Sequence, residues 1–174
     1  NYLIEQYNLK DYLEIGVNDG SCIRQIIATN KDGVDPQHSA ETNGAFVPEI
    51  NYQMTSDNFF ESYVSKKYDI IFIDGLHHSD QVDKDIQNSL KHLNENGTIV
   101  CHDCLPTTER MQERYDHGGE WTGDVWKAIA QLRVERDDLD IKVVDTDYGC
   151  GIIRYGLSER YIPTDLNYLT YEYF

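Results

Sequence analysis

The chain has 174 residues, and its 31 acidic against 15 basic side chains give a formal net charge of -16. This length predicts one domain with a substantial core, and the charge argues against nucleic acid and anionic membrane surfaces as partners. No apolar run approaches the roughly 20 residues of a membrane span, and the first residues show no signal-peptide pattern, so we expect a cytoplasmic protein. The sequence does not begin with Met, which leaves open that it belongs to a longer chain.

Apolar runs alternate with helical patterns along the chain, which predicts a mostly parallel sheet built from βαβ units. The last two strands are joined by a turn at Tyr148 and Gly149, so we expect them to be antiparallel to each other. The expected strands are 11–15, a short one ending at 33–36, 51–55, 69–74, 98–101, 141–145 and 150–155. The expected helices are 21–29, 58–67, 79–93 and 123–134, and the tail 157–174 is unassigned.

The first strand ends in a carboxylate and a glycine-containing turn. Gly16 and Gly20 let the backbone pass close to a ligand before the first helix begins. A carboxylate at Glu14 would repel a pyrophosphate but suits a ligand with a positive charge or hydroxyl groups, and Asn18 replaces the central glycine of a dinucleotide fingerprint. The turn therefore favours S-adenosylmethionine over NAD.

The four cysteines are too few and too irregularly spaced for a disulfide scaffold, so reduced thiols are expected. Cys101 and Cys104 form a single C-x-x-C, for which redox or zinc chemistry competes with simple packing of small side chains. Packing is the favoured interpretation.

Every predicted parallel strand ends in or just before a carboxylate. In an open α/β sheet the ligand lies outside the carboxyl ends of the strands, so successive acidic side chains there indicate a site. These residues are Glu14, Asp35, Asp57, Asp74 and Asp103.

With these motifs in order, the chain resembles the class I S-adenosylmethionine-dependent methyltransferases. YLEIGVNDGS, GVDP, TSDNF, YDIIFIDGLHH and NGTIVCHD are similar to the first to fifth motifs of that family. IDGLHHSDQVDKDI, GTIVCHD and GDVWKAI more narrowly resemble a small-molecule and sugar O-methyltransferase-like subgroup, related to the macrocin O-methyltransferase type. The resemblance implies a single α/β domain over 1–174, a Rossmann-like three-layer sandwich with a mostly parallel seven-stranded sheet and an antiparallel last strand.

The resemblance also implies a cofactor site for S-adenosylmethionine. It puts Glu14 and Gly16 beside the methionine part, with the amide groups of the turn facing the ligand, and Asp35 on the ribose hydroxyls. A turn-forming role for Asp35 and helix capping by Asp57 are the competing interpretations. The complete expected set is Glu14, Gly16, Asn18, Gly20, Asp35, Ser56, Asp57 and Asp74, with Ser56 and Asp57 at the adenine edge.

Methyl transfer to oxygen benefits from a base or a metal that removes the acceptor's proton. The expected catalytic residues are His77, His102 and Asp103, while helix capping or packing are the alternatives for the histidines. Related enzymes hold magnesium at these strand ends, so Asp74, His102 and Asp103 are candidate ligands for Mg or Mn, although an imidazole suits magnesium poorly.

The segment 105–122 lies where an acceptor lid is expected. Its aromatic residues and the Gly118–Gly119 pair suit a mobile loop that stacks on a sugar or aryl ring, and core packing is the competing role, favoured for Trp126. The residues considered are Arg110, Arg114, Tyr115, His117, Trp121 and Trp126.

The predicted function is transfer of a methyl group from S-adenosylmethionine to a hydroxyl oxygen of a sugar or other small polar acceptor. The alternatives are an NAD-linked oxidoreductase on a similar fold and a non-catalytic methyltransferase-like module of a larger protein. A protein acceptor also stays open.

Overall fold

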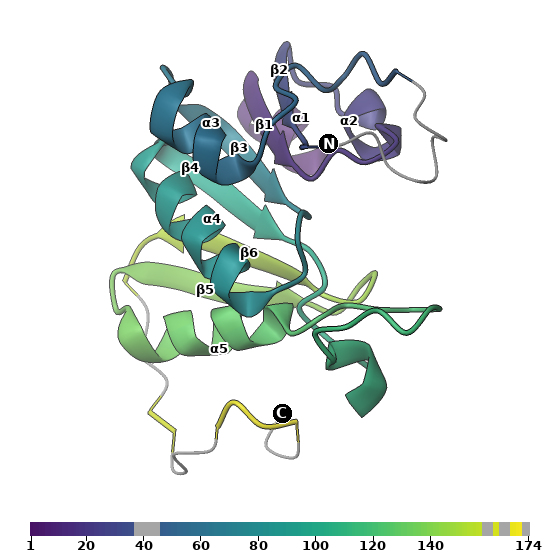
Figure 1. Cartoon of the computed structure of the whole chain (residues 1–174). Coiled ribbons are helices and arrows are strands. Elements are labelled where there is room, and N and C mark those ends of the chain that lie inside the picture. Colours follow the sequence, from purple (N-terminus) through teal and green to yellow (C-terminus); the bar gives the residue numbers. More distant parts are fainter. Residues whose placement is uncertain (37–45, 158–161, 164–167, 172–174) are drawn as a thin grey trace. The chain divides into compact units, whose positions relative to one another are not determined.

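The computed structural model describes residues 1–36, 46–157, 162–163 and 168–171 (Figure 1). Residues 37–45 and parts of the tail 157–174 therefore lie outside the described residues. The described helices are α1 (Tyr2–Tyr7), α2 (Ser21–Gln25), α3 (Ser56–Ser62), α4 (Ser79–Lys91) and α5 (Val125–Glu135), with a 3-10 helix, η2, at Glu109–Gln112. The described strands are β1 (Asp11–Ile15), β2 (Asn30–Val34), β3 (Tyr68–Ile73), β4 (Leu93–Cys101), β5 (Leu139–Val144) and β6 (Cys150–Tyr155).

These strands form one sheet in the order β2-β1-β3-β4-β6-β5. β1 is parallel to both of its neighbours, whereas β5 and β6 are antiparallel, as expected from the turn between them. The expected α/β Rossmann-like class with an antiparallel last strand is confirmed, but the described residues contain six strands and not the expected seven.

The missing strand is the one expected at 51–55. Tyr52 makes a single parallel bridge to Val34, and no ladder follows. The side chain of Asn51 accepts the Gly33 amide at 2.8 Å, so a side-chain oxygen takes a hydrogen bond that a paired strand would give to backbone. This side-chain hydrogen bond therefore stops the residues at 51–55 from pairing with β2 beyond the single bridge.

Several element boundaries also differ from expectation, among them that of α3, which spans Ser56–Ser62 and not 58–67. α2 ends at Gln25, since Ile26 is extended and the Lys31 ammonium group binds the carbonyl oxygens of Ile23 and Ile26 at 2.8 and 3.1 Å. The turn expected at Asn96 and Gly97 falls inside β4, where Asn96 has a φ of 66°.

The chain divides into two compact units, residues 1–75 with 84–99 and residues 76–83 with 100–174. The first unit has an apolar core that includes Tyr12, Ile23 and Ile70. In the second, α5 buries one face, and β5 and β6 bury Leu139 and Ile153. The prediction of a single domain stays a prediction.

No helix in the described ranges combines the length and apolar character that crossing a bilayer requires.

Candidate active site

β1 holds Glu14 in a buried position near its end, with only 1% of the residue exposed. Tyr12 and Glu14 lie on the same face of β1, and the Tyr12 hydroxyl donates to Glu14 Oε2 at 2.5 Å. Glu14 Oε1 is buried without a well-formed hydrogen bond from any described residue. A carboxylate oxygen left in this state fits a ligand that brings a positive charge or a donor.

Burial raises the pKa of the Glu14 carboxyl to about 7, and the negative charge of Asp74 acts in the same direction. The Tyr12 hydroxyl, the Cys22 thiol and the Ile23 amide favour the charged form but do not outweigh burial. Burial and the Glu14 carboxylate together raise the pKa of Tyr12, so that hydroxyl stays protonated and keeps donating. Sequence reasoning missed Tyr12, although its two-residue spacing from Glu14 on a strand was a usable signal.

Gly16 is required by its surroundings. Its φ is +88°, and a Cβ at this position would lie 2.0 Å from the backbone oxygen of Asp74. The backbones that follow β1 and β3 therefore touch at this point, and only glycine permits the contact.

Asn18 is explained by its conformation and its hydrogen bond. It has a φ of 50°, which Asn tolerates better than most residues with a Cβ. Its backbone amide donates to Asp35 Oδ2 at 2.9 Å, which orients the carboxylate expected to hold the ribose.

The expectation that the turn's amide groups face a ligand is wrong for three of them. The Gly16 amide donates to the Val34 carbonyl at 2.9 Å and the Gly20 amide to the Val17 carbonyl at 2.8 Å, while the Asn18 amide binds Asp35. These bonds arise because the turn closes against β2 and against itself.

At the adenine-edge positions, Ser56 is buried and begins α3, and Asp57 lies in the first turn of that helix. Thr55 is the N-cap, because its side chain accepts the Asn58 amide at 3.3 Å. Asp57 is therefore not the capping residue, and it lies 3.6 Å from Lys84.

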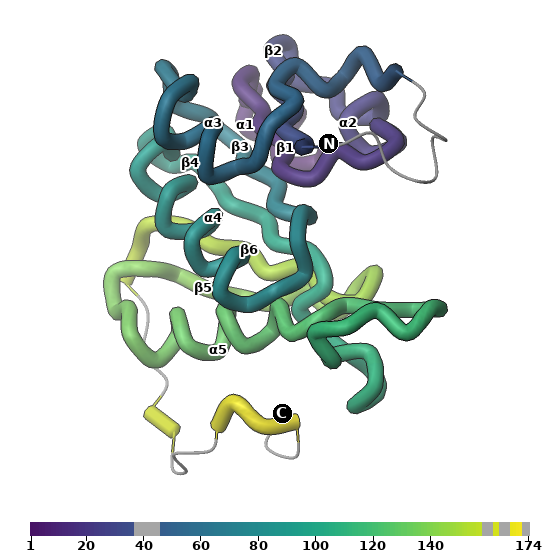
Figure 2. Tube along the Cα trace, viewed as in Figure 1, coloured from purple at the N-terminus to yellow at the C-terminus, as the bar shows by residue number. Residues whose placement is uncertain are grey.

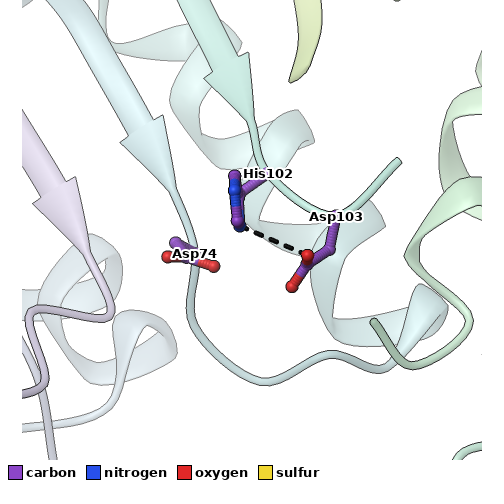
Figure 3. Close-up of side chains that lie close together, drawn as sticks. All are labelled: Asp74, His102 and Asp103. Atoms are coloured by element: carbon purple, nitrogen blue, oxygen red, sulfur yellow. Dashed lines mark ion pairs between the residues drawn. The ribbon is translucent and has the colours of Figure 1, made fainter. Parts of the chain in front are cut away.

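The second unit brings together all three expected catalytic residues. Asp103 is buried, and its two carboxylate oxygens face two histidines: Oδ2 lies 3.2 Å from His77 Nδ1, and Oδ1 lies 3.3 Å from His102 Nδ1. Asp103 has a φ of 61°, so the chain turns sharply directly after β4. Figure 3 shows the contact between His102 and Asp103 as a dashed line, and it labels Asp74 at the end of β3.

Asp147 is a further member that sequence reasoning missed. Its Oδ2 lies 3.2 Å from His102 Nε2. Asp147 and Tyr148 both have positive φ in the tight turn between β5 and β6, and the Tyr148 carbonyl accepts the Leu105 amide at 2.7 Å. The turn was visible in the sequence, but its docking beside the residues after β4 was not.

The segment expected to be an acceptor lid, 105–122, leaves β4 and leads into α5, shown in green in Figure 2. Trp126 is buried in α5, in agreement with the core role favoured for it. Trp121 stacks on His77, with ring centroids 4.8 Å apart and planes at 22°. Arg114 contacts Asp80 at 2.6 Å and Asp124 at 3.3 Å.

The cysteines are all free thiols, and Cys101 and Cys104 are buried. The Cys104 thiol donates to the Cys101 carbonyl at 3.2 Å. This arrangement agrees with packing as their role.

Comparison with known proteins places this geometry in context. A family model described as "Methyltransferase domain" matches residues 13–104. A search of curated proteins finds no match.

Several solved structures share the fold. The S-adenosylhomocysteine-bound methyltransferase PaMTH1 of Podospora anserina has a TM-score of 0.64 and 16% identity, over 89% of this chain and 75% of that chain. The O-methyltransferase TomG of Streptomyces achromogenes, in complex with S-adenosylmethionine and involved in tomaymycin synthesis, gives 0.63 and 14%, over 88% and 76%. An O-methyltransferase from Bacillus cereus in complex with S-adenosylhomocysteine gives 0.62 and 12%, over 89% and 78%.

Proposed function

The chain belongs to the methyltransferase-domain family, and from this premise we propose that it transfers a methyl group from S-adenosylmethionine to a hydroxyl oxygen of a small polar acceptor such as a sugar. The observation that carries the oxygen acceptor is Asp103, a buried carboxylate within 3.3 Å of a ring nitrogen of both His77 and His102. A hydroxyl group needs a proton acceptor to become a good nucleophile, and an imidazole supported by a carboxylate is a suitable one.

The end of β1 and the turn that follows it fit the donor. Glu14 presents a buried carboxylate oxygen that suits a cationic ligand, and Gly16 lets the turn after β1 pass directly against the backbone at Asp74. When bound, S-adenosylmethionine supplies a methyl group on a positively charged sulfur. Asp35, oriented by the Asn18 amide, accepts from the ribose hydroxyls in this proposal.

In the chemical step, His77 or His102 accepts the proton of the acceptor hydroxyl at a ring nitrogen, while the hydroxyl oxygen forms its bond to the methyl carbon. The bond between that carbon and the sulfur breaks, and its electron pair stays on the sulfur of the S-adenosylhomocysteine that leaves. Asp103 supports both rings and stabilises the positive charge that the protonated histidine carries. The NAD-linked alternative lacks this support, because the family model matches methyltransferases.

A metal ion remains part of the proposal, with Asp74, His102 and Asp103 as the predicted ligands. The separation of 3.3 Å between His102 Nδ1 and Asp103 Oδ1 fits two ligands of one octahedral ion, for which metal–ligand distances of about 2.1 Å imply a separation near 3 Å. Asp147 beside His102 Nε2 matches the carboxylate that commonly orients a metal-binding histidine. The mixed nitrogen and oxygen set favours Mn over Mg.

Calorimetry with S-adenosylhomocysteine tests the donor site, and we expect binding in the micromolar range or tighter. No binding at millimolar ligand would reject the proposal. The acceptor is tested by detecting S-adenosylhomocysteine release with a panel of methyl pyranosides and catechols, and binding without release from any of them would favour the non-catalytic module.

Chelation tests the metal. If the proposed ion is required, EDTA abolishes methyl transfer and added Mn or Mg restores it. Unchanged turnover under EDTA removes the metal from the mechanism and leaves the histidine base.

A further inference from the structure

The residues from Trp121 to Asp124, here termed the strap, contact His77 and the start of α4. Gly123 has a φ of +59°, and a Cβ there would lie 1.9 Å from the His77 carbonyl oxygen. The same oxygen accepts the Asp124 amide at 3.2 Å, and Asp124 Oδ1 accepts the Ser79 amide at 2.8 Å. The strap thus fixes the backbone on which the His77 ring is mounted.

The strap is fixed in turn by hydrogen bonds to the backbone carbonyls of Met111 and Glu113. The Trp121 indole N–H donates to the Glu113 carbonyl at 2.6 Å. The buried Thr122 donates to the Met111 carbonyl twice, from its amide at 3.0 Å and from its hydroxyl at 3.1 Å. The orientation of the Trp121 ring is therefore set by protein contacts, with no acceptor needed to hold it.

The His77 ring is restrained in two directions. Trp121 covers one face, with planes at 22°, which limits tilting of the imidazole. Asp103 Oδ2 lies 3.2 Å from Nδ1, so the carboxylate favours the ring orientation that keeps Nδ1 on its side. A ring restrained in both ways presents a constant direction to whatever lies beside it.

We propose that Trp121 is a positioning residue for the reaction, which fixes the imidazole plane of His77 by stacking on it. This inference rests on the proposed function, because it assigns His77 the proton-accepting role. It differs from the sequence expectation, in which the lid aromatics stack on the acceptor.

The test compares Trp121→Phe, which keeps an aromatic plane, with Trp121→Leu, which keeps apolar bulk without one. With any pyranoside or catechol that the wild type methylates, we expect Trp121→Leu to lower kcat roughly 10- to 100-fold, since small misplacements of a reacting group have effects of this size. The acceptor KM should stay within about threefold, and Trp121→Phe should keep about half of the wild-type kcat, because positioning acts on the chemical step.

A second measurement requires no acceptor. In NMR spectra of histidine-labelled protein, the His77 Hε1 signal, assigned with His77→Gln, should be shifted upfield by the indole ring current. Trp121→Phe should keep part of that shift, and Trp121→Leu should abolish it. Tyr155→Leu, which removes a half-exposed aromatic ring of β6, is the control and should leave both kcat and the His77 signal unchanged.

Two results would overturn the inference. The first is a Trp121→Leu variant with a raised acceptor KM and an unchanged kcat, which would mean that Trp121 stacks on the acceptor. The second is a His77 signal that does not change in Trp121→Leu. Failure of the proposed function has a different signature. It would appear as a wild-type protein that transfers no methyl group, whatever the NMR spectra show.

Discussion

Glu14 is buried in a way that costs folding free energy whenever its carboxyl group is charged. Its pKa is about 7 in the folded protein, against the ordinary 4.5. Between these values the folded state binds more protons than the unfolded state, so this group's contribution makes stability fall as pH rises, and the cost levels off above pH 7. Such a group is tolerated at a site where a cationic ligand can compensate for it.

Glu14→Gln tests this coupling. Glutamine keeps the shape without the charge, so the variant should gain stability relative to wild type by about 3 kcal/mol at pH 8.5 and by little at pH 5. Urea unfolding at the two pH values measures the difference. Glu61→Gln, at an exposed position on α3, is the control. An equal gain at both pH values would show that ionisation of Glu14 is not the cause.

Gly16 and Gly75 form a matched pair for testing backbone approach at the donor site. A Cβ on Gly16 would meet the Asp74 oxygen at 2.0 Å, whereas a Cβ on Gly75 would lie 3.5 Å from Ile15, an ordinary contact. Gly16→Ala should destabilise the protein by more than about 2 kcal/mol and weaken S-adenosylhomocysteine binding, and Gly75→Ala should cost less than about 1 kcal/mol. Thermal unfolding with and without ligand separates the two effects, and equal costs would contradict the close approach.

At the scale of elements, α4 depends on a distant residue at its N-terminus. Asp124 is 3% exposed, accepts the Ser79 amide at 2.8 Å, and contacts Arg114 at 3.3 Å and Lys127 at 3.6 Å. The residue that satisfies the first turn of α4 therefore comes from the segment that precedes α5. Removing it would take away the acceptor of the Ser79 amide and one of the two carboxylates that contact Arg114.

Asp124→Ala should destabilise the fold by about 2 kcal/mol, as expected for loss of a helix-end acceptor together with ion pairs of which only the carboxylate is buried. Asp80→Ala is the matched control. Asp80 contacts the same Arg114, but its side chain is 71% exposed, so its loss should cost less than about 1 kcal/mol. Chemical unfolding curves of the two variants provide the comparison, and similar costs would mean that Asp124 contributes only a surface ion pair.

At the scale of the whole molecule, the net charge of -16 spread over 174 residues opposes compaction. Added salt screens repulsion between exposed like charges. Raising NaCl from about 10 mM to about 300 mM, where the screening length falls well below 10 Å, should therefore raise Tm by several degrees. Calorimetry in a salt series, with KCl as a check on ion identity, tests this; a flat or falling Tm would mean that specific ion pairs outweigh the net repulsion.

The sequence by itself determined the elements whose signals are local. β3 was recognisable as a strand buried on both faces because a short, continuous apolar run is typical of such strands. In the structure the consecutive residues Ile70 and Ile71 are both buried. Gly16 was recognisable for a similar reason, since the turn's backbone conformation excludes most other residues. The grouping of His77, His102 and Asp103 followed from a general rule, that the ends of parallel strands meet at one edge of the sheet.

Tertiary structure alone decided which residues act as partners. The expected strand at 51–55 failed because the Asn51 side chain takes the Gly33 amide, a competition that hydrophobic pattern does not report. Trp121 on His77, Asp147 beside His102 and Asp124 at Ser79 join segments far apart in the chain. Periodicity and turn propensity describe neighbours in sequence, whereas these contacts depend on how loops pack after the sheet has formed, which is why they emerged only from the structure.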